Sequence, residues 1–491
     1  MKIMIKKIAL GVFLLNILPI ILNAQIKQIR TNEEIVSWVT EYMDNAVKFD
    51  HFSGVVLIAR NGNPIFSKAY GMANFELEVP NELDTKFRIG SVSKQFTAAA
   101  IMQLQERGKL DINDPICQYL YDCPKTWQFI TIKNLLNHTS GIVNFTTLSQ
   151  ASGNFLLLPH THTEVVNTFR NIPLESKPGE IYNYNNSGYY LLGLIIEKAS
   201  GINYPEYLRK NIFQPLGMNN TDFDNQRTIL KNRASSYYLG ADSIFYNSEY
   251  TNMQILFSIG GLYSTVSDLL LWEQSFSNNK LLKHSTINEM LTSGKGNYGY
   301  GWWIDKIGDY SRMYHDGGIT NFSSSLQRIP DEHLTIIAIS NRGDDGGLRT
   351  AYDIVGKISG VPATIRAIQP ELMTLSTDRL LEIVSEAKSN FPPFDIQEFK
   401  VEEIGNYLVL IGLEQQAIEV FKLNVNLYPD SANTYFKLAM TYEEVGEKNL
   451  AVKYFRLCLA KDPTNKIASE HIKKMVTNQP IKELQLFARK R

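Results

Sequence analysis

The sequence predicts a layered α/β (α+β) fold, with an antiparallel sheet flanked by helices, an all-helical part and a helical C-terminal module. Two observations carry this prediction: strand-like runs lie at both ends of residues 25–365 around a long helical segment, and a 34-residue period appears after about residue 370. The 491 residues are 44% hydrophobic and 20% charged, with a net charge of -1. This composition excludes a mainly disordered chain and offers no broad basic face for nucleic acid.

The first 24 residues read as a secretory signal peptide. Lys2, Lys6 and Lys7 precede an apolar run over 8–22, which ends at Asn23-Ala24-Gln25. The run is short for a membrane span, which needs about 20 apolar residues, although an uncleaved anchor is the alternative. We expect cleavage after Ala24 and an exported protein, periplasmic or extracellular, with no membrane span after cleavage.

The predicted domain over 25–365 builds its sheet from both of its ends. Near its start, a helix over 32–49 with Asn32 as its cap precedes a hairpin of strands over 54–58 and 64–69. Near its end, strands over 323–327 and 334–340 flank a turn at Pro330-Asp331, before a helix over 348–358. Because helical patterns fill the segment between, the two ends should share one sheet.

The C-terminal part carries an internal repeat. Gly412 and Gly446, Ala417 and Ala451, Phe421 and Phe455, and Pro429 and Pro463 are each 34 residues apart, and the second copy resembles the tetratricopeptide pattern. We predict a helical linker over 366–397, two such repeats with a capping helix (467–475) over 398–477, and a basic tail over 478–491. Two repeats bury little core alone, so we expect packing on the preceding domain, binding of a protein partner or self-association.

The chain has three cysteines, too few for a disulfide scaffold. Cys117 and Cys123 lie close enough to pair in an exported protein, and this pairing is left open. Cys458 sits in an apolar helical pattern and is expected in the core.

The strongest chemical motif is Ser91-Val92-Ser93-Lys94, which opens an Ala-rich helical run. Three-residue spacing puts Ser91 and Lys94 on one helix face, so the amine can reach the hydroxyl. A lysine can remove the proton of a serine only if burial or nearby positive charge keeps it neutral. The motif alone also fits a capped helix with a solvent-facing lysine.

The context of this motif resembles the serine β-lactamase and penicillin-binding protein superfamily, specifically its class C branch. The resemblance covers about residues 33–360, and three motifs occur in the family's order: Ser91-x-x-Lys94, Tyr184-Asn185-Asn186 and His315-Asp316-Gly317. Further matching segments are 52–97, 108–115, 130–142, 178–193, 260–268 and 298–302. The resemblance implies a β-lactamase/transpeptidase-like fold and a serine hydrolase without cofactor or metal.

The resemblance also implies roles for these residues. Ser91 attacks a carbonyl and forms an acyl-enzyme, while Lys94 and Tyr184 share the role of base. We expect Tyr184, near a cation, to lose its proton more readily than a free phenol. Asn186 would donate to a substrate amide and orient Lys94.

In the third motif, Gly317 and Gly318 let the strand approach the substrate. The backbone N–H groups of Ser91 and Gly318 would form an oxyanion hole, with each donor contributing about 3 kcal/mol to transition-state stabilisation.

His315 stands where many β-lactamases carry lysine. An imidazole is mostly neutral at pH 7, so a permanent cation for a substrate carboxylate is missing, which disfavours efficient β-lactam hydrolysis. His-x-Gly occurs among D-Ala-D-Ala carboxypeptidases, D-amino-acid peptidases and esterases of this superfamily, so the resemblance implies one of these activities, with small peptides, β-lactam-like compounds or esters as substrates. The alternatives are a β-lactamase and, from another class, a retired penicillin-binding sensor or scaffold that works through its repeats.

Three other groups of residues could be mistaken for functional sites. His160, His162 and Glu164 offer too few ligands for a metal site and favour a surface loop. His138 is expected to be a structural hydrogen-bonding residue. Asp344-Asp345-Gly346-Gly347 reads as a turn, because it lacks the further acidic ligands of a calcium loop.

Overall fold

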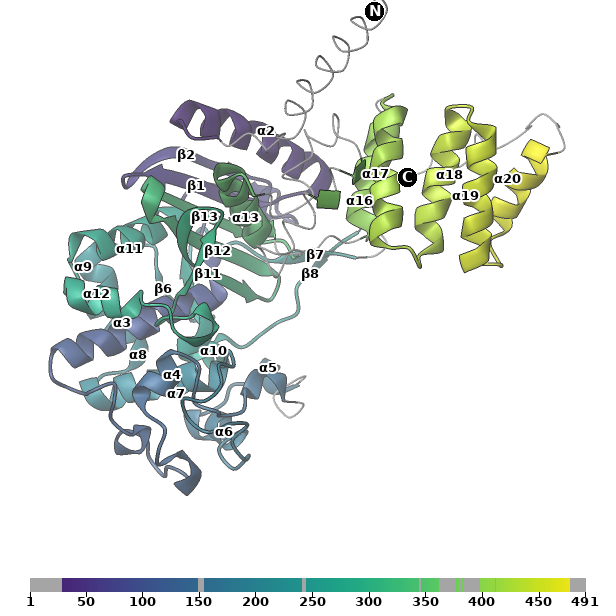
Figure 1. Ribbon diagram of the computed structural model, residues 1–491. Coiled ribbons are helices and arrows are strands. Elements are labelled where there is room, and N and C mark those ends of the chain that lie inside the picture. Colours follow the sequence, from purple (N-terminus) through teal and green to yellow (C-terminus); the bar gives the residue numbers. More distant parts are fainter. Residues whose placement is uncertain are drawn as a thin grey trace, which may run out of the picture. The chain divides into compact units, whose positions relative to one another are not determined.

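The computed structural model describes residues 29–148, 154–240, 244–343, 346–361, 377–378, 381–382, 398–410 and 412–476. The chain divides into two compact units, one over Arg30–Val355 and one that contains the C-terminal helices (Figure 1). The predicted signal peptide, most of the predicted linker, the basic tail and Asp344-Asp345 lie outside the described residues.

The Arg30–Val355 unit contains a six-stranded antiparallel sheet, which confirms the predicted fold class. Its order is β10-β11-β12-β13-β1-β2. The strands are β1 (Gly54–Arg60), β2 (Asn63–Tyr70), β10 (Trp303–Ile307), β11 (Tyr310–Ile319), β12 (Phe322–Ile329) and β13 (Leu334–Ser340). Because β1 pairs with β13 along its full length, the two ends of the domain meet in the middle of one sheet.

Helices cover both faces of this sheet. On one face, α2 (Asn32–Asp50) and α13 (Gly346–Ser359) lie side by side, and Tyr42 donates a 2.8 Å hydrogen bond to Asp353 (Figure 1). On the other, α11 (Val266–Asn278) contacts β1 and β13. The cap of α2 is Thr31, which exchanges hydrogen bonds with Glu34 in a capping box, so the prediction of Asn32 as the cap is wrong by one residue.

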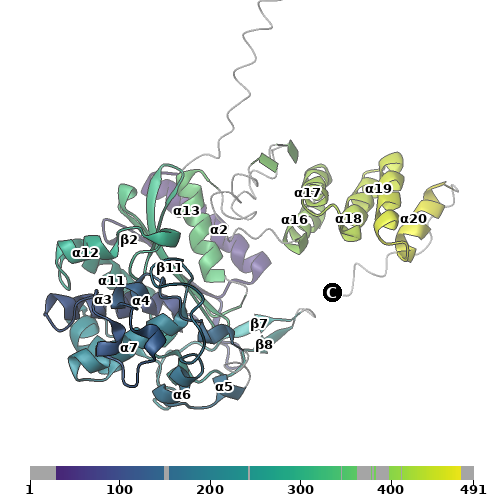
Figure 2. The ribbon, with the colours of Figure 1, turned by 60° about the horizontal axis from the view of Figure 1, so that its bottom comes forward.

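A helical lobe forms the rest of the unit (Figure 2). Its central helix α3 (Ser93–Glu106) is buried around most of its circumference and packs against α7 (Asn186–Ser200) and α10 (Met253–Gly260). The other helices are α4 (Ile132–Leu136), α5 (Asn154–Leu157), α6 (His162–Asn167), α8 (Tyr204–Leu208), α9 (Gln214–Leu216) and α12 (His284–Met290). Short strands complete the unit: β3 (Met72–Asn74), β4 (Val79–Pro80), β5 (Phe87–Arg88), β6 (Asp222–Phe223), β7 (Tyr237–Leu239), β8 (Phe245–Asn247) and β9 (Leu262–Ser264). One continuous apolar core joins the lobe to the sheet.

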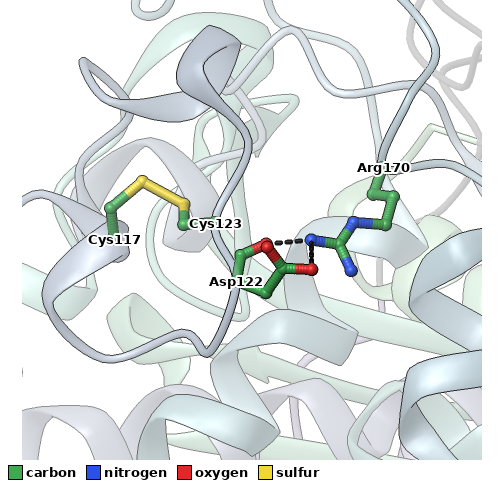
Figure 3. Close-up of a disulfide and its surroundings, with 4 residues drawn as sticks. All are labelled: Cys117, Asp122, Cys123 and Arg170. Carbon is green, nitrogen blue, oxygen red and sulfur yellow. Dashed lines mark hydrogen bonds and ion pairs between the residues drawn. A yellow bond between two sulfur atoms is a disulfide. The ribbon is translucent and has the colours of Figure 1, made fainter.

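A disulfide closes the loop between α3 and α4. Cys117 and Cys123 are joined, which resolves the pairing that the sequence leaves open (Figure 3). Within the loop, Asp122 has a positive φ of 51° and forms an ion pair of 2.7 Å with Arg170. The loop is therefore fixed by a covalent bond and by a charged pair.

The C-terminal unit contains two antiparallel helical hairpins and a fifth helix. These are α16 (Glu398–Leu410), α17 (Glu414–Leu427), α18 (Ala432–Glu444), α19 (Lys448–Lys461) and α20 (Lys466–Val476). Gly412 and Gly446 both adopt a positive φ, which lets the chain turn between the helices of each hairpin. The repeat positions Ala417, Ala451, Phe421 and Phe455 are all buried in one core, together with Cys458. Helical repeats are thus present, while their assignment as tetratricopeptide repeats stays a prediction.

Among the described residues, none of the helices combines the length and the apolar character needed to cross a bilayer.

Candidate active site

Ser91 and Lys94 meet at the start of α3, where a short 3-10 turn (Gly90–Val92) leads into the helix. Lys94 Nζ lies 3.0 Å from Ser91 Oγ and donates a 2.8 Å hydrogen bond to the carbonyl of Ile259. Lys94 is fully buried, and burial lowers its pKa well below the ordinary 10.5. The structure therefore places an amine whose charged form is disfavoured by burial beside the serine hydroxyl, and a lysine base requires such a shift.

Tyr184 lies over the same amine. Lys94 Nζ is 5.0 Å from the centroid of the Tyr184 ring. Within the described part of the chain, the Tyr184 hydroxyl is buried without a hydrogen-bond partner of good geometry. Burial raises the pKa of Tyr184, and the neighbouring Ser91 lowers it by a smaller amount. The expectation that Tyr184 loses its proton readily is wrong because burial outweighs every favourable interaction, so the phenol stays a proton donor.

Asn186 begins α7, one residue after the N-cap Asn185. Its side-chain amide donates to Thr146 Oγ1 at 2.9 Å. The Asn186 Oδ1 atom is buried and has no partner among the described groups. The hydrogen bonds of Lys94 run to Ser91 and Ile259, so the predicted orientation of Lys94 by Asn186 is not seen.

His315 is buried inside an aromatic cluster. Its Nδ1 lies 2.7 Å from the carbonyl of Asp316 and its Nε2 lies 2.9 Å from the hydroxyl of Tyr298. Because a carbonyl can only accept, the proton sits on Nδ1 and Nε2 accepts from Tyr298. Burial, assisted by Lys94, lowers the pKa of His315 to about 3. This position therefore holds a neutral ring, which packs 4.5 Å from the ring of Trp303.

The two glycines of the third motif lie where β11 meets the 3-10 turn of Ser91. Pairing of β10 with β11 ends at Tyr314, and the strand beyond it contacts that turn. A Cβ on Gly317 would lie 2.0 Å from the carbonyl oxygen of Ile89, and a Cβ on Gly90 would lie 2.8 Å from the nitrogen of Gly318. The close approach therefore requires glycine at 317 and 90, whereas a Cβ at Gly318 would meet nothing within 4 Å.

The sequence reasoning missed two contributors to this site. The Ile259 carbonyl that binds Lys94 leaves no side-chain signal, because any residue could supply it. Tyr298, whose hydroxyl bonds His315 Nε2, lies within the matching segment 298–302, but this contact depends on the fold.

The other histidines do not join the site as bases or metal ligands. His138 is buried and its Nδ1 accepts from the Asn185 backbone at 3.0 Å, which fits the structural role expected of it. His162 bonds the Tyr190 hydroxyl at the start of α6, and His160 lies 3.8 Å from Glu164. In the part of the chain that the structure describes, no three His, Cys, Asp or Glu side chains gather as metal ligands would.

Comparisons with known proteins show the family of this chain. The family described as Beta-lactamase matches residues 37–356. A penicillin-binding protein of Bacillus subtilis (strain 168) is 31% identical over 421 residues, which cover 80% of this chain and 89% of the relative. The chain therefore belongs to the β-lactamase and penicillin-binding protein superfamily of serine hydrolases.

Solved structures show the same fold. The octameric penicillin-binding protein homologue from Pyrococcus abyssi is 26% identical with a TM-score of 0.61, over 69% of this chain and 81% of that one. A D-stereospecific amidohydrolase from a Streptomyces species is 25% identical with a TM-score of 0.57, over 65% of this chain and 97% of that one. These matches define the superfamily, and likeness to its class C branch stays a prediction.

Proposed function

We propose that this protein is an exported serine hydrolase that forms an acyl-enzyme on Ser91, acting as a D-Ala-D-Ala carboxypeptidase, a D-amino-acid peptidase or an esterase. The observation that carries the proposal is the fully buried Lys94, whose Nζ lies 3.0 Å from the Ser91 hydroxyl and whose pKa burial lowers. A buried lysine without an acidic partner is costly to a fold, so its place beside a serine at a helix start favours a catalytic role.

Acylation would proceed in two proton transfers. Lys94 takes the proton of Ser91 as Oγ attacks the substrate carbonyl, and the N–H groups of Ser91 and Gly318 stabilise the oxyanion. As the intermediate collapses, the bond to the leaving group breaks and that group receives a proton from Tyr184, which Lys94 then reprotonates. Water reverses the sequence: it releases the acid product and restores the Ser91 hydroxyl.

The third motif bears on the substrate class. The neutral, buried His315 cannot serve as a cation for a substrate carboxylate. A substrate therefore needs no carboxylate that faces His315. Amides or esters of D-amino acids fit such a site, and the Streptomyces relative, a D-stereospecific amidohydrolase, supports this class. A β-lactam that acylates Ser91 but clears slowly would also fit.

The decisive experiment compares Ser91→Ala with Ser93→Ala, a matched change two residues away at the same helix start. We expect Ser91→Ala to abolish p-nitrophenyl ester turnover and labelling by a serine-reactive phosphonate, whereas Ser93→Ala keeps both. Intact-mass spectrometry after exposure to penicillins, D-Ala-D-Ala peptides and activated esters then shows which adducts form and which clear. Retention of labelling by Ser91→Ala would contradict the proposal.

Export is part of the same proposal. The signal-like segment over 1–24 and the Cys117–Cys123 disulfide both support an oxidising compartment outside the cytoplasm. N-terminal sequencing of the protein from its native host should begin at Gln25. An intact Met1 terminus on the mature protein would contradict cleavage.

For the C-terminal unit we propose docking of a protein partner or self-association through two tetratricopeptide-like repeats. The 34-residue period and the shared buried positions of both hairpins support this assignment. Deletion of residues 398–491 should remove partner binding or lower the mass measured by light scattering, while phosphonate labelling continues. Binding lost together with complete absence of acylation in the full chain would favour the retired sensor instead.

A further inference from the structure

Helix α10 contains one residue outside the helical conformation. Phe257 has a φ of 25° and a ψ of -116°, and it is only 4% exposed. A positive φ is unusual for a bulky side chain and strains the backbone. The surroundings must therefore hold Phe257 in place.

The kink turns two successive carbonyls out of α10 and toward α3. The carbonyl of Ser258 accepts from Thr97 Oγ1 at 2.8 Å, and the carbonyl of Ile259 accepts from Lys94 Nζ at 2.8 Å. Lys94 and Thr97 are three residues apart, so they project from the same face of α3. The unusual backbone of Phe257 thus comes just before the acceptor that contacts the proposed base.

An aromatic cage clamps the Phe257 ring. The ring centroids of His162, Tyr204 and Tyr190 lie 4.4, 5.0 and 5.2 Å from that of Phe257. On α7, a Cβ at Gly193 would lie 2.3 Å from Cε1 of Phe257 and 2.3 Å from Oγ of Ser258. Gly193 therefore leaves the space in which Phe257 and Ser258 pack against α7.

We propose that Phe257 is a positioning residue for acyl transfer, because its clamped backbone holds the Ile259 carbonyl against Lys94 Nζ. A neutral amine has two hydrogens and one lone pair. When one hydrogen is donated to Ile259, rotation of the amine is restricted and the lone pair is kept available to the Ser91 hydroxyl. The same carbonyl then stabilises the ammonium group that forms after proton transfer. This inference rests on the proposed function of Ser91 and Lys94.

The test is the rate of phosphonate labelling of Ser91 in the full chain, measured from about pH 5 to about pH 10. In Phe257→Gly, which removes the ring, and in Phe257→Leu, which keeps apolar volume, we expect labelling to slow roughly tenfold to hundredfold. The acid limb of the profile should also move to lower pH, because an ammonium without its carbonyl acceptor holds its proton less tightly. A merely structural role would slow labelling equally at every pH and leave the limb unmoved, which would overturn the proposal.

A glycine pair on α7 gives an independent variant and its matched control. Gly193→Ala pushes on Phe257 and Ser258 and should reproduce the slower rate and the shifted limb. Gly188→Ala adds the same methyl group at 3.6 Å from Leu135, an ordinary contact, and should behave as wild type. If Phe257→Gly does not fold, Phe257→Leu and Gly193→Ala decide the outcome.

The two proposals fail in different ways. Wild type that is not labelled at Ser91 would contradict the proposed function itself. Wild type that is labelled, with Phe257→Leu and Gly193→Ala at the wild-type rate and limb, would contradict only the positioning role of Phe257.

Discussion

The two units of this protein differ in how a set of polar side chains in each is satisfied. In the Arg30–Val355 unit, Lys94 and His315 are buried and the half-buried Tyr184 has a covered hydroxyl, and no carboxylate forms an ion pair with Lys94 or His315 among the described residues. In the C-terminal unit, the buried Thr434 and Thr441 donate to nearby backbone carbonyls within their own segment. The first arrangement lowers the pKa of a lysine and a histidine, which a fold tolerates where chemistry needs it. The second satisfies each hydroxyl with a backbone carbonyl nearby in sequence and involves no ionisable side chain.

The largest expected effect comes from Lys94→Met, which exchanges the buried amine for an apolar side chain of similar length. We expect labelling of Ser91 to fall by roughly 10²- to 10⁴-fold, because the base is lost. The melting temperature should hold or rise, since a costly buried polar group is removed. Calorimetry and labelling kinetics on the same sample check this. A fall in both the labelling rate and the melting temperature would show that Lys94 stabilises the fold. The contrast between a reactive polar group in the first unit and structural ones in the second would then not hold.

In the C-terminal unit, the corresponding large change is Phe455→Ala in the repeat core. Loss of this fully buried ring should cost about 3–5 kcal/mol in the unfolding free energy of that unit. Labelling of Ser91 should continue at the wild-type rate, because Phe455 lies in the separate repeat core. Chemical denaturation followed by circular dichroism, with labelling as the second readout, tests this independence. A labelling rate that falls with Phe455→Ala would show that the two units are coupled.

Acid should destabilise the Arg30–Val355 unit through His315. The folded-state pKa of about 3 lies below the ordinary 6.5, so between these values the unfolded chain binds the proton and the folded one does not. Stability therefore falls as pH drops from 6.5 toward 3 and is unaffected by His315 above 6.5. Denaturant titrations of wild type and His315→Gln over this window should show a smaller pH dependence in the variant. Equal slopes would contradict a neutral, buried His315.

The smallest expected effect concerns the disulfide. Replacing Cys117 and Cys123 with serine opens a short loop, which in the chain-entropy account costs roughly 2 kcal/mol. Ser91 labelling should stay within about twofold of wild type, because neither cysteine contributes to the Ser91 contacts. Thermal unfolding of the double variant beside disulfide-bonded wild type measures the cost. A large loss of labelling would instead show that this loop helps to hold Ser91 and its neighbours in place.

Much of the fold followed from local pattern. The alternating and apolar runs at both ends of the first unit predicted β1, β2, β12 and β13, and the 34-residue period predicted the hairpins of the second. The ordered motifs also predicted a site at Ser91, Lys94 and Tyr184; the three side chains lie close together, and their roles stay a proposal. These features could be predicted from the sequence because helix and strand periodicity and motif spacing are properties of short stretches of chain.

What the sequence alone determined is the layered fold, the helical repeat and the choice of residues that we propose for the site. Only the tertiary structure decided their protonation and their partners: that Tyr184 keeps its proton, that His315 is a neutral ring bonded to Tyr298, and that Ile259 rather than Asn186 holds Lys94. The reason is physical. A pKa depends on burial and on groups brought from distant segments, and a backbone carbonyl carries no side-chain signature, so neither can be read before the chain has packed.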